Sequence, residues 1–314
     1  MYEVSLIMPV YNVAKFVEVS LRSALSQDFD SIEYIIVNDC ATDNSLEIVK
    51  RVVDSSSRKD DVVIVNRETN GGLSAARNTG LERAHGKYVY IMDSDDEISN
   101  DCISLLYAKA ENSCVDFVVS NFRLVGSKSV HIHPIPLDVC DKRPLESYFS
   151  RSWSVSACNK LYRRDFIDEH KLRFVEGIHH EDYLWSYEVA KNARNLDVVE
   201  KQTYDYKIRQ GSITTIVNGD LKIKSMLYIL KTISKDDSGL DSLRDRFLGF
   251  VGFNTALYIL NYKGERTRKE YYDELRMITP SRPTIFNKLT KLSYYIFVPL
   301  IKPVYIIYKY LITR

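Results

Sequence analysis

The alternation of short apolar runs with amphipathic segments is the feature that most constrains the fold of this chain. Four runs rich in branched residues are typical of buried parallel strands, namely VSLIMPV (4–10), YIIV (34–37), VVIV (62–65) and YVYIM (88–92). Between them, apolar residues recur at helical spacing. Strands separated by helices of this length indicate βαβ units. We therefore predict an α/β fold, with a mainly parallel sheet and helices on both faces.

A polar segment follows each of the last three predicted strands. Asp39 follows the second, Asn70-Gly71-Gly72 the third, and the acidic group Asp93, Asp95 and Asp96 the fourth. In sheets of this kind, ligands bind beyond the carboxyl ends of the strands. We expect these three loops to converge on one rim of the sheet.

The acidic group is the strongest chemical signal. Three carboxylates within four positions repel one another, which folding does not favour unless a cation offsets the charge. Mg²⁺ or Mn²⁺ takes oxygen ligands and can bridge carboxylates to a diphosphate. The alternative is an Asp/Ser turn that caps a helix starting near Ile98, and the pattern by itself leaves both open.

Two single residues have comparable ambiguity. Asp39 is either an acceptor for a pyrimidine N–H or an ordinary turn residue of the loop 38–44. Arg77 lies on a predicted helix with a small-residue face, so it either reaches the rim to pair with phosphate or base, or lies on a solvated face.

Glu181 and Asp182 stand in front of a helical pattern, after His179 and His180. They are either helix-capping carboxylates or a general base for an acceptor hydroxyl. The helix N-terminus is expected to keep such a base ionised and to lower its basicity. A zinc site of these histidines with His131 and His133 is disfavoured, because their spacing fits no tetrahedral pattern.

Composition excludes some classes of function. Lys and Arg total 43 against 42 Asp and Glu, so no global charge favours nucleic-acid binding. Five cysteines without a CxxC motif suit free thiols in a reducing compartment. The N-terminus MYEVSLIMPVYN lacks a secretory signal pattern, and the signatures of P-loop, dinucleotide-binding and serine-hydrolase proteins are missing. We expect a cytoplasmic protein.

The C-terminal segment differs in character. Residues 280–314 carry six basic residues and no acidic one, around the stretch YYIFVPLIKPVYIIYKYLI. Two lysines and two prolines argue against a spanning helix. We predict an amphipathic anchor on an anionic membrane face. The alternative is a helix that packs on the catalytic domain or forms a homodimer interface.

Five ordered blocks between residue 3 and about residue 216 strongly resemble glycosyltransferase family 2, the inverting enzymes of GT-A fold. They are VSLIMPVYN, YIIVNDCATDNS, NGGLSAARNTGLERAHGKYVYIMDSDD, CNKLYRRDF and HHEDYLW, followed by YKIRQGSIT. Cys40-Ala41 departs from the small Gly/Ser pair of many members, which puts the shape of that loop in question.

The resemblance implies a role for each matching residue. Pro9, Tyr11 and Asp39 would line the nucleoside pocket, with Arg77 near base or phosphates. Asp93 and Asp95 would be the DxD pair, with Asp95 the direct metal ligand, Asp93 also near the ribose and Asp96 near the donor sugar. Asp182 would be the catalytic base and Glu181 would help to position the acceptor. Arg209 and Ser212 would belong to an element that closes over the diphosphate.

The resemblance also implies an organisation. We expect a GT-A catalytic domain over 1–216, with a nucleotide-sugar half (1–114) and an acceptor half (115–216), then a helical extension (217–280) and the basic tail (281–314). The expected activity is metal-dependent, inverting transfer of one sugar from a nucleotide-sugar, expected to be a UDP-sugar, to an acceptor hydroxyl. Together with the basic tail, the resemblance suggests that the acceptor is a lipid-linked glycan at the cytoplasmic face of the plasma membrane. Alternatives are a catalytically silent binding module on this fold, or a nucleotidyltransferase, whose Gly-rich phosphate loop is lacking.

Overall fold

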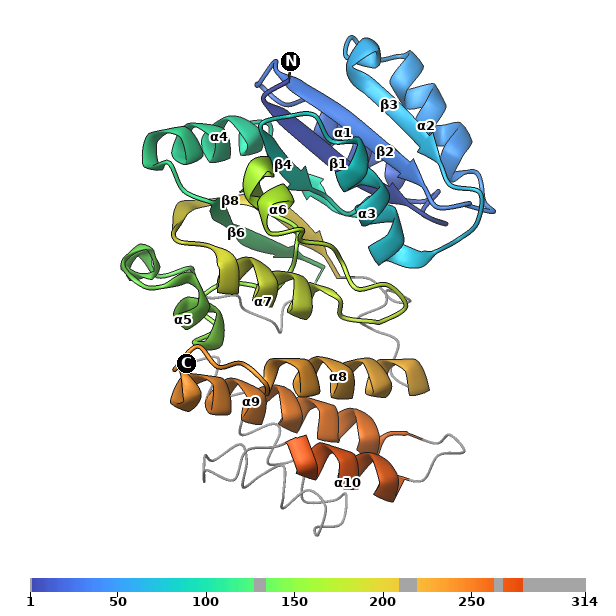
Figure 1. Ribbon diagram of the computed structural model, residues 1–314. Helices are drawn as coiled ribbons and strands as arrows, with labels where there is room; N and C mark the ends of the chain where they lie inside the picture. Colours follow the sequence, from blue (N-terminus) through green and yellow to red (C-terminus); the bar gives the residue numbers. More distant parts are fainter. Residues whose placement is uncertain (1, 127–133, 209–218, 263–267, 279–314) are drawn as a thin grey trace. The chain divides into compact units, whose positions relative to one another are not determined.

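The computed structural model describes residues 2–126, 134–208, 219–262 and 268–278 (Figure 1). The chain divides into two units. The first comprises Met1–Tyr148, Ser152–Gly177 and Glu181–Ile208, and the second comprises Phe149–Arg151, Ile178–His180 and Arg209–Arg314. The predicted domain boundary at 216 lies outside the described residues.

The N-terminal half of the first unit is the predicted parallel sheet. Strands β1 (Val4–Val10), β2 (Ile32–Asn38), β3 (Val62–Asn66) and β4 (Tyr88–Ile91) pair in parallel, in the order β3-β2-β1-β4. Every residue of β1, β2 and β4 is buried, as expected of strands covered on both faces. Helices α1 (Val17–Leu25), α2 (Ser45–Asp54) and α3 (Gly72–Arg83) connect them. The predicted α/β class is confirmed.

Antiparallel strands extend this sheet into a mixed one of eight strands, in the order β3-β2-β1-β4-β7-β6-β8-β5. Strand β7 (Lys160–Arg163) pairs antiparallel with both β4 and β6 (Phe117–Val125). Strand β8 (Leu196–Lys207) runs parallel to β6, and β5 (Glu97–Ile98) pairs antiparallel with β8. The GT-A architecture predicted from the sequence is confirmed.

The remaining elements before the end of β8 are α-helices and 3₁₀ turns. A 3₁₀ turn, η1 (Lys59–Asp61), precedes β3, and α4 (Cys102–Ser113) packs against β6 and β8. A second 3₁₀ turn, η2 (Leu137–Asp141), comes before α5 (Pro144–Phe149), α6 (Arg164–Glu169) and α7 (Asp182–Asn192). The expectation of a helix starting near Ile98 is wrong, because Ile98 lies in β5 and the helix begins at Cys102.

The predicted helical extension is also confirmed. Helices α8 (Asp220–Ile233), α9 (Asp241–Leu260) and α10 (Arg268–Ile278) pack on one another within the second unit (Figure 1). Among the described residues, no helix has the length and apolarity needed to cross a membrane. The tail predicted to bind a membrane lies outside the described residues.

Candidate functional site

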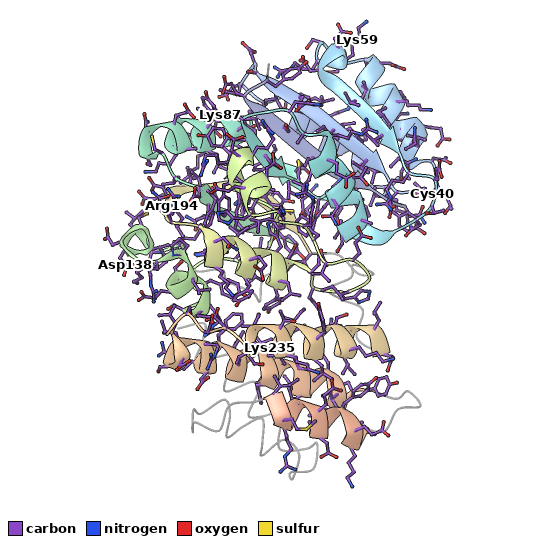
Figure 2. All side chains as sticks on the ribbon, in the orientation of Figure 1. Cys40, Lys59, Lys87, Asp138, Arg194 and Lys235 are labelled. Atoms are coloured by element: carbon purple, nitrogen blue, oxygen red, sulfur yellow. The ribbon has the colours of Figure 1, made fainter. Side chains whose placement is uncertain are left out.

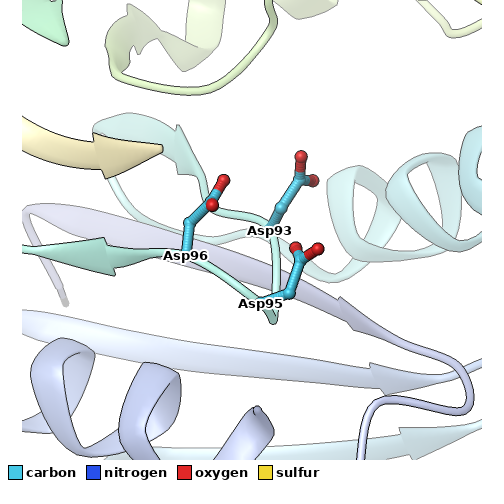
Figure 3. A group of neighbouring side chains, drawn as sticks. All are labelled: Asp93, Asp95 and Asp96. Atoms are coloured by element: carbon cyan, nitrogen blue, oxygen red, sulfur yellow. The ribbon is translucent and has the colours of Figure 1, made fainter. Parts of the chain in front are cut away.

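The acidic turn, defined as Asp93, Asp95 and Asp96, follows directly after the end of β4 (Figure 3). One carboxylate oxygen from each side chain lies within 4.8 Å of the others. Among the described residues it is the only group of three or more potential metal ligands found. Three hard oxygen donors at this separation fit Mg²⁺ or Mn²⁺, as the sequence predicts.

Asp96 is the most constrained member of the acidic turn. It is 2% exposed and accepts hydrogen bonds from Tyr204 Oη at 2.9 Å and from the backbone N–H of Lys207 at 2.8 Å. Burial raises the pKa of Asp96 to about 8, and the charges of Asp93 and Asp95 add to the shift. A carboxylate in such surroundings gains from a nearby cation, which favours its ionised form.

Arg77 on α3 joins the acidic turn to two further carboxylates. Its Nη2 donates to Asp93 Oδ1 at 2.8 Å, and its Nη1 donates to Glu181 Oε1 at 2.7 Å and to Asp182 Oδ1 at 2.8 Å. The side chain is 1% exposed and its guanidinium lies 5.1 Å from the centroid of the Phe174 ring. The solvated-face alternative for Arg77 is therefore wrong, and its guanidinium is held by three carboxylates.

The three carboxylates around Arg77 stabilise the charged form of its guanidinium. Burial opposes the charged form, but Asp182, Asp93 and Glu181 together raise the pKa of Arg77 well above its usual value. Removing one partner of a buried ion pair is strongly destabilising, since it leaves an uncompensated charge. These ion pairs join the acidic turn to Glu181 and Asp182.

Glu181 and Asp182 stand at the N-terminal end of α7, as predicted. Glu181 is the residue before the helix and makes no side-chain capping bond, whereas Asp182 lies in the first turn, where its charge complements the helix dipole. Burial raises the pKa of Glu181 to about 7, helped by the charge of Asp182, and burial likewise raises the pKa of Asp182. The expectation that the helix N-terminus lowers the basicity of Asp182 is thus reversed. Asp182 keeps 24% of its side chain exposed.

Asp39 connects the loops that follow β2 and β3. Its carboxylate accepts from the backbone N–H groups of Gly71 at 3.0 Å and Gly72 at 2.8 Å, and Arg67 Nε lies 3.1 Å away. The predicted convergence of these two loops is therefore visible in hydrogen bonds. Arg67, in the segment NRETNGG, was missed by the sequence reasoning. The adjacent Cys40 is exposed and has a φ of 60° (Figure 2).

The other predicted nucleoside contacts lie at the end of β1. Pro9 is opposite Val37 in the pairing of β1 with β2, and Tyr11 follows the strand with 46% of its surface exposed. Tyr11 can therefore present its ring to a ligand. Arg209 and Ser212 lie outside the described residues, so their predicted roles stay predictions.

Lys160 is a second residue that the sequence reasoning missed. Although charged, it is 2% exposed on β7, and its ammonium donates to the carbonyl oxygens of Ser154, at 2.9 Å, and Ser156. Burial lowers the pKa of Lys160 to about 8. The positive charge of Lys160 also lowers the pKa of Asp182, the predicted base. The only signal was a lysine at the start of a buried strand, in CNKLYRRDF.

The histidines do not form a metal site among the described residues. His131 and His133 lie outside that part of the chain. Burial lowers the pKa of His180 to about 4 and also lowers the pKa of His179. All five cysteines are free thiols, as predicted.

The fold and this acidic rim define a glycosyltransferase of GT-A type. The family model described as "Glycosyl transferase family 2" matches residues 5–171. The chain belongs to this family. It is 30% identical over 226 residues to the uncharacterized glycosyltransferase YibD of Escherichia coli (strain K12), which covers 68% of this chain and 64% of that protein. The chain thus spans less than two thirds of the length of this relative.

Two solved structures share the fold. The crystal structure of Staphylococcus aureus TarS 1-349 in complex with UDP-GlcNAc matches with a TM-score of 0.72 at 23% identity, covering 94% of this chain and 87% of that one. The mannosyltransferase PcManGT from Pyrobaculum calidifontis, in complex with GDP-Man and Mn²⁺, matches with a TM-score of 0.58 at 15% identity and covers 95% and 81%.

Proposed function

We propose that this glycosyltransferase moves one sugar from a UDP-sugar to an acceptor hydroxyl, with a divalent cation and with inversion at the anomeric carbon. The observation that carries the proposal is the shared guanidinium of Arg77, which bonds Asp93 of the acidic turn and Asp182 at 2.8 Å each. The proposed cation site and the proposed base are therefore bonded by the two terminal nitrogens of one guanidinium.

The residues divide the work of a single displacement. Tyr11 and Asp39 bind the nucleoside, Asp93 and Asp95 hold the cation, and Asp96 faces the donor sugar. A bound cation would neutralise the negative charge that develops on the departing diphosphate. The acceptor oxygen bonds to the anomeric carbon as the bond to the diphosphate oxygen breaks, and Asp182 takes the hydroxyl proton. A base with a raised pKa suits this role near neutral pH.

Several observations support the choice of donor and cation. TarS was crystallised with UDP-GlcNAc and PcManGT with GDP-Man and Mn²⁺. Asp39 has two backbone N–H donors orienting its carboxylate, which leaves acceptor capacity for a pyrimidine N–H. These features favour a UDP-sugar with Mn²⁺ or Mg²⁺.

We further propose a lipid-linked glycan as acceptor, in cell-surface polysaccharide synthesis at the cytoplasmic face of the plasma membrane. The support is the composition of residues 280–314, with six basic and no acidic residues around an apolar, tyrosine-rich stretch. Such a segment favours binding to anionic lipid. Self-association through the same segment is the alternative, and light scattering with and without vesicles separates the two.

The experiment is a donor screen by thermal stabilisation and UDP release. UDP-sugars with Mn²⁺ should raise the Tm of the wild-type protein and release UDP slowly, and Asp95→Ala should lose both effects. Asp165→Ala, whose side chain is 79% exposed away from the site, is the matched control. Binding without any UDP release, across donors and acceptors, would indicate a catalytically silent module instead. Undiminished binding after chelation would overturn the role of the metal.

A further inference from the structure

The hydroxyl of Tyr204 is placed between both ends of the acidic turn. It accepts a hydrogen bond from the backbone N–H of Asp93 at 3.2 Å and donates one to Asp96 Oδ2 at 2.9 Å. Tyr204 is fully buried, and its ring packs edge-on against Phe122 with centroids 5.1 Å apart. One oxygen atom thus fixes the start and the end of the turn relative to each other.

The rest of β8 reinforces this placement. Lys207, three residues further along the strand, donates its backbone N–H to Asp96 Oδ1 at 2.8 Å, and its ammonium pairs with Glu97. Glu97 is also opposite Asp205 in the antiparallel pairing of β5 with β8. Residues of β8 therefore bond the acidic turn at both ends. Tyr204 is the β8 residue that bonds Asp93, the first residue of the turn.

We propose that Tyr204 is a positioning residue that sets the separation of Asp93 and Asp96, and through it the cation-binding geometry of the acidic turn. This inference rests on the proposed function. Phenylalanine would keep the ring and its packing but would leave the Asp93 N–H and a buried oxygen of Asp96 without this partner. Buried polar groups that lose their partner move or recruit water, so the three carboxylates would no longer hold their spacing.

The test compares Tyr204→Phe with Tyr34→Phe. Tyr34 is fully buried on β2 of the same sheet, and its ring lies beside the Arg58 guanidinium, 5.7 Å away, rather than at the acidic turn. Hydrogen exchange on the ligand-free protein should show backbone amides of residues 92–97 exchanging about tenfold faster or more in Tyr204→Phe only. Titration of Mn²⁺ with UDP should show affinity weakened by about tenfold to a hundredfold, as expected for losing a hydrogen bond to a charged acceptor.

Kinetics give a further distinction. A positioning role predicts that Tyr204→Phe raises the Mn²⁺ concentration needed for half-maximal UDP release, while its circular dichroism spectrum stays that of the folded wild-type protein. Unchanged exchange at 92–97, or unchanged Mn²⁺–UDP affinity beside a wild-type protein that binds, overturns the proposal. If the wild-type protein binds no Mn²⁺–UDP, the proposed function fails, and the exchange measurement by itself decides whether Tyr204 sets the turn.

Discussion

Arg77 Nη1 lies 2.8 Å from Asp182 Oδ1, although 105 positions separate the two residues in the sequence. The same nitrogen bonds Glu181, and the other terminal nitrogen bonds Asp93. The predicted base, Asp182, is therefore oriented by the guanidinium of Arg77, which lies on α3 in the nucleotide half of the fold. The geometry assigns Arg77 a part in aligning the base with the reacting centre.

Arg77→Lys should lower kcat by about a hundredfold, because displacing a reacting group by about 1 Å costs that much. Lysine keeps the positive charge but is a single point donor, so it cannot hold carboxylates on both sides as the planar guanidinium does. UDP release measures the rate, and Mn²⁺–UDP titration measures donor binding. The control is Arg22→Lys, whose side chain is 55% exposed on α1. A normal rate in Arg77→Lys would contradict the alignment role.

Asp182→Asn should lower kcat by about 10²–10⁴-fold, the usual contribution of a general base, while binding of the UDP-sugar changes little. Asparagine is close in shape but cannot accept the hydroxyl proton. Single-turnover measurements with a saturating donor separate chemistry from binding. Asp165→Asn, on the exposed surface of α6, should behave as wild type. If Asp182→Asn kept a near-normal rate, another group would be the base.

The pH dependence of the rate should report the raised pKa of Asp182. A base whose pKa is raised takes up its proton at higher pH, so activity is full above this pKa and is lost below it. The acid limb of the kcat profile should therefore lie above the ordinary aspartate range. Lys160, whose own pKa is lowered to about 8 by burial, lowers the pKa of Asp182 through its positive charge.

Lys160→Met should move the acid limb to higher pH by on the order of one unit, since the nearby positive charge is removed. Lys87→Met, at a half-exposed site paired with Glu111, is the control and should leave the limb in place. If the acid limb of the kcat profile were unchanged in a folded Lys160→Met protein, Lys160 would only support the loop 153–157.

Gly86→Ala should destabilise the first unit by about 1–3 kcal/mol, as expected for overpacking. Gly86 lies between the end of α3 at Arg83 and the start of β4 at Tyr88. A Cβ atom there would meet the backbone N of Ser5 at 2.6 Å and the carbonyl carbon of Val4 at 2.7 Å. Gly219→Ala is the control, because a Cβ atom there would meet only the backbone N of Lys222 at 3.9 Å, an ordinary contact distance. Equal denaturation midpoints for the two variants would show that β1 can shift.

Much of the nucleotide half follows from local sequence. Strand patterns and the polar residues after them were enough to predict that Asp39 and the acidic turn lie on one rim, because parallel strands end at a common edge. The partners of Arg77 were beyond reach, since pairing across 105 positions leaves no periodic signal. The basicity of Asp182 was predicted in the wrong direction, because the helix N-terminus is a local feature whereas burial depends on the whole fold.

The antiparallel insertion of β7 was equally hidden. It is four residues long and consists of two basic residues around Leu and Tyr, so nothing in the pattern marks its direction or its neighbours. The contacts of Lys160 depend on the position of β7 in the sheet, and those of Tyr204 depend on the position of β8. Local sequence patterns indicate candidate ligand-binding residues, but they do not indicate the buried residues that support those side chains.

Three carboxyl groups and the one buried guanidinium that they share cannot be altered independently. Replacing two of Asp93, Glu181 and Asp182 together should cost less than the sum of the separate losses, because the first change already disturbs what the second would break. Divergence among proteins with this arrangement should accordingly spare the quartet and gather on the surfaces around it, where a change of side chain leaves no stranded charge.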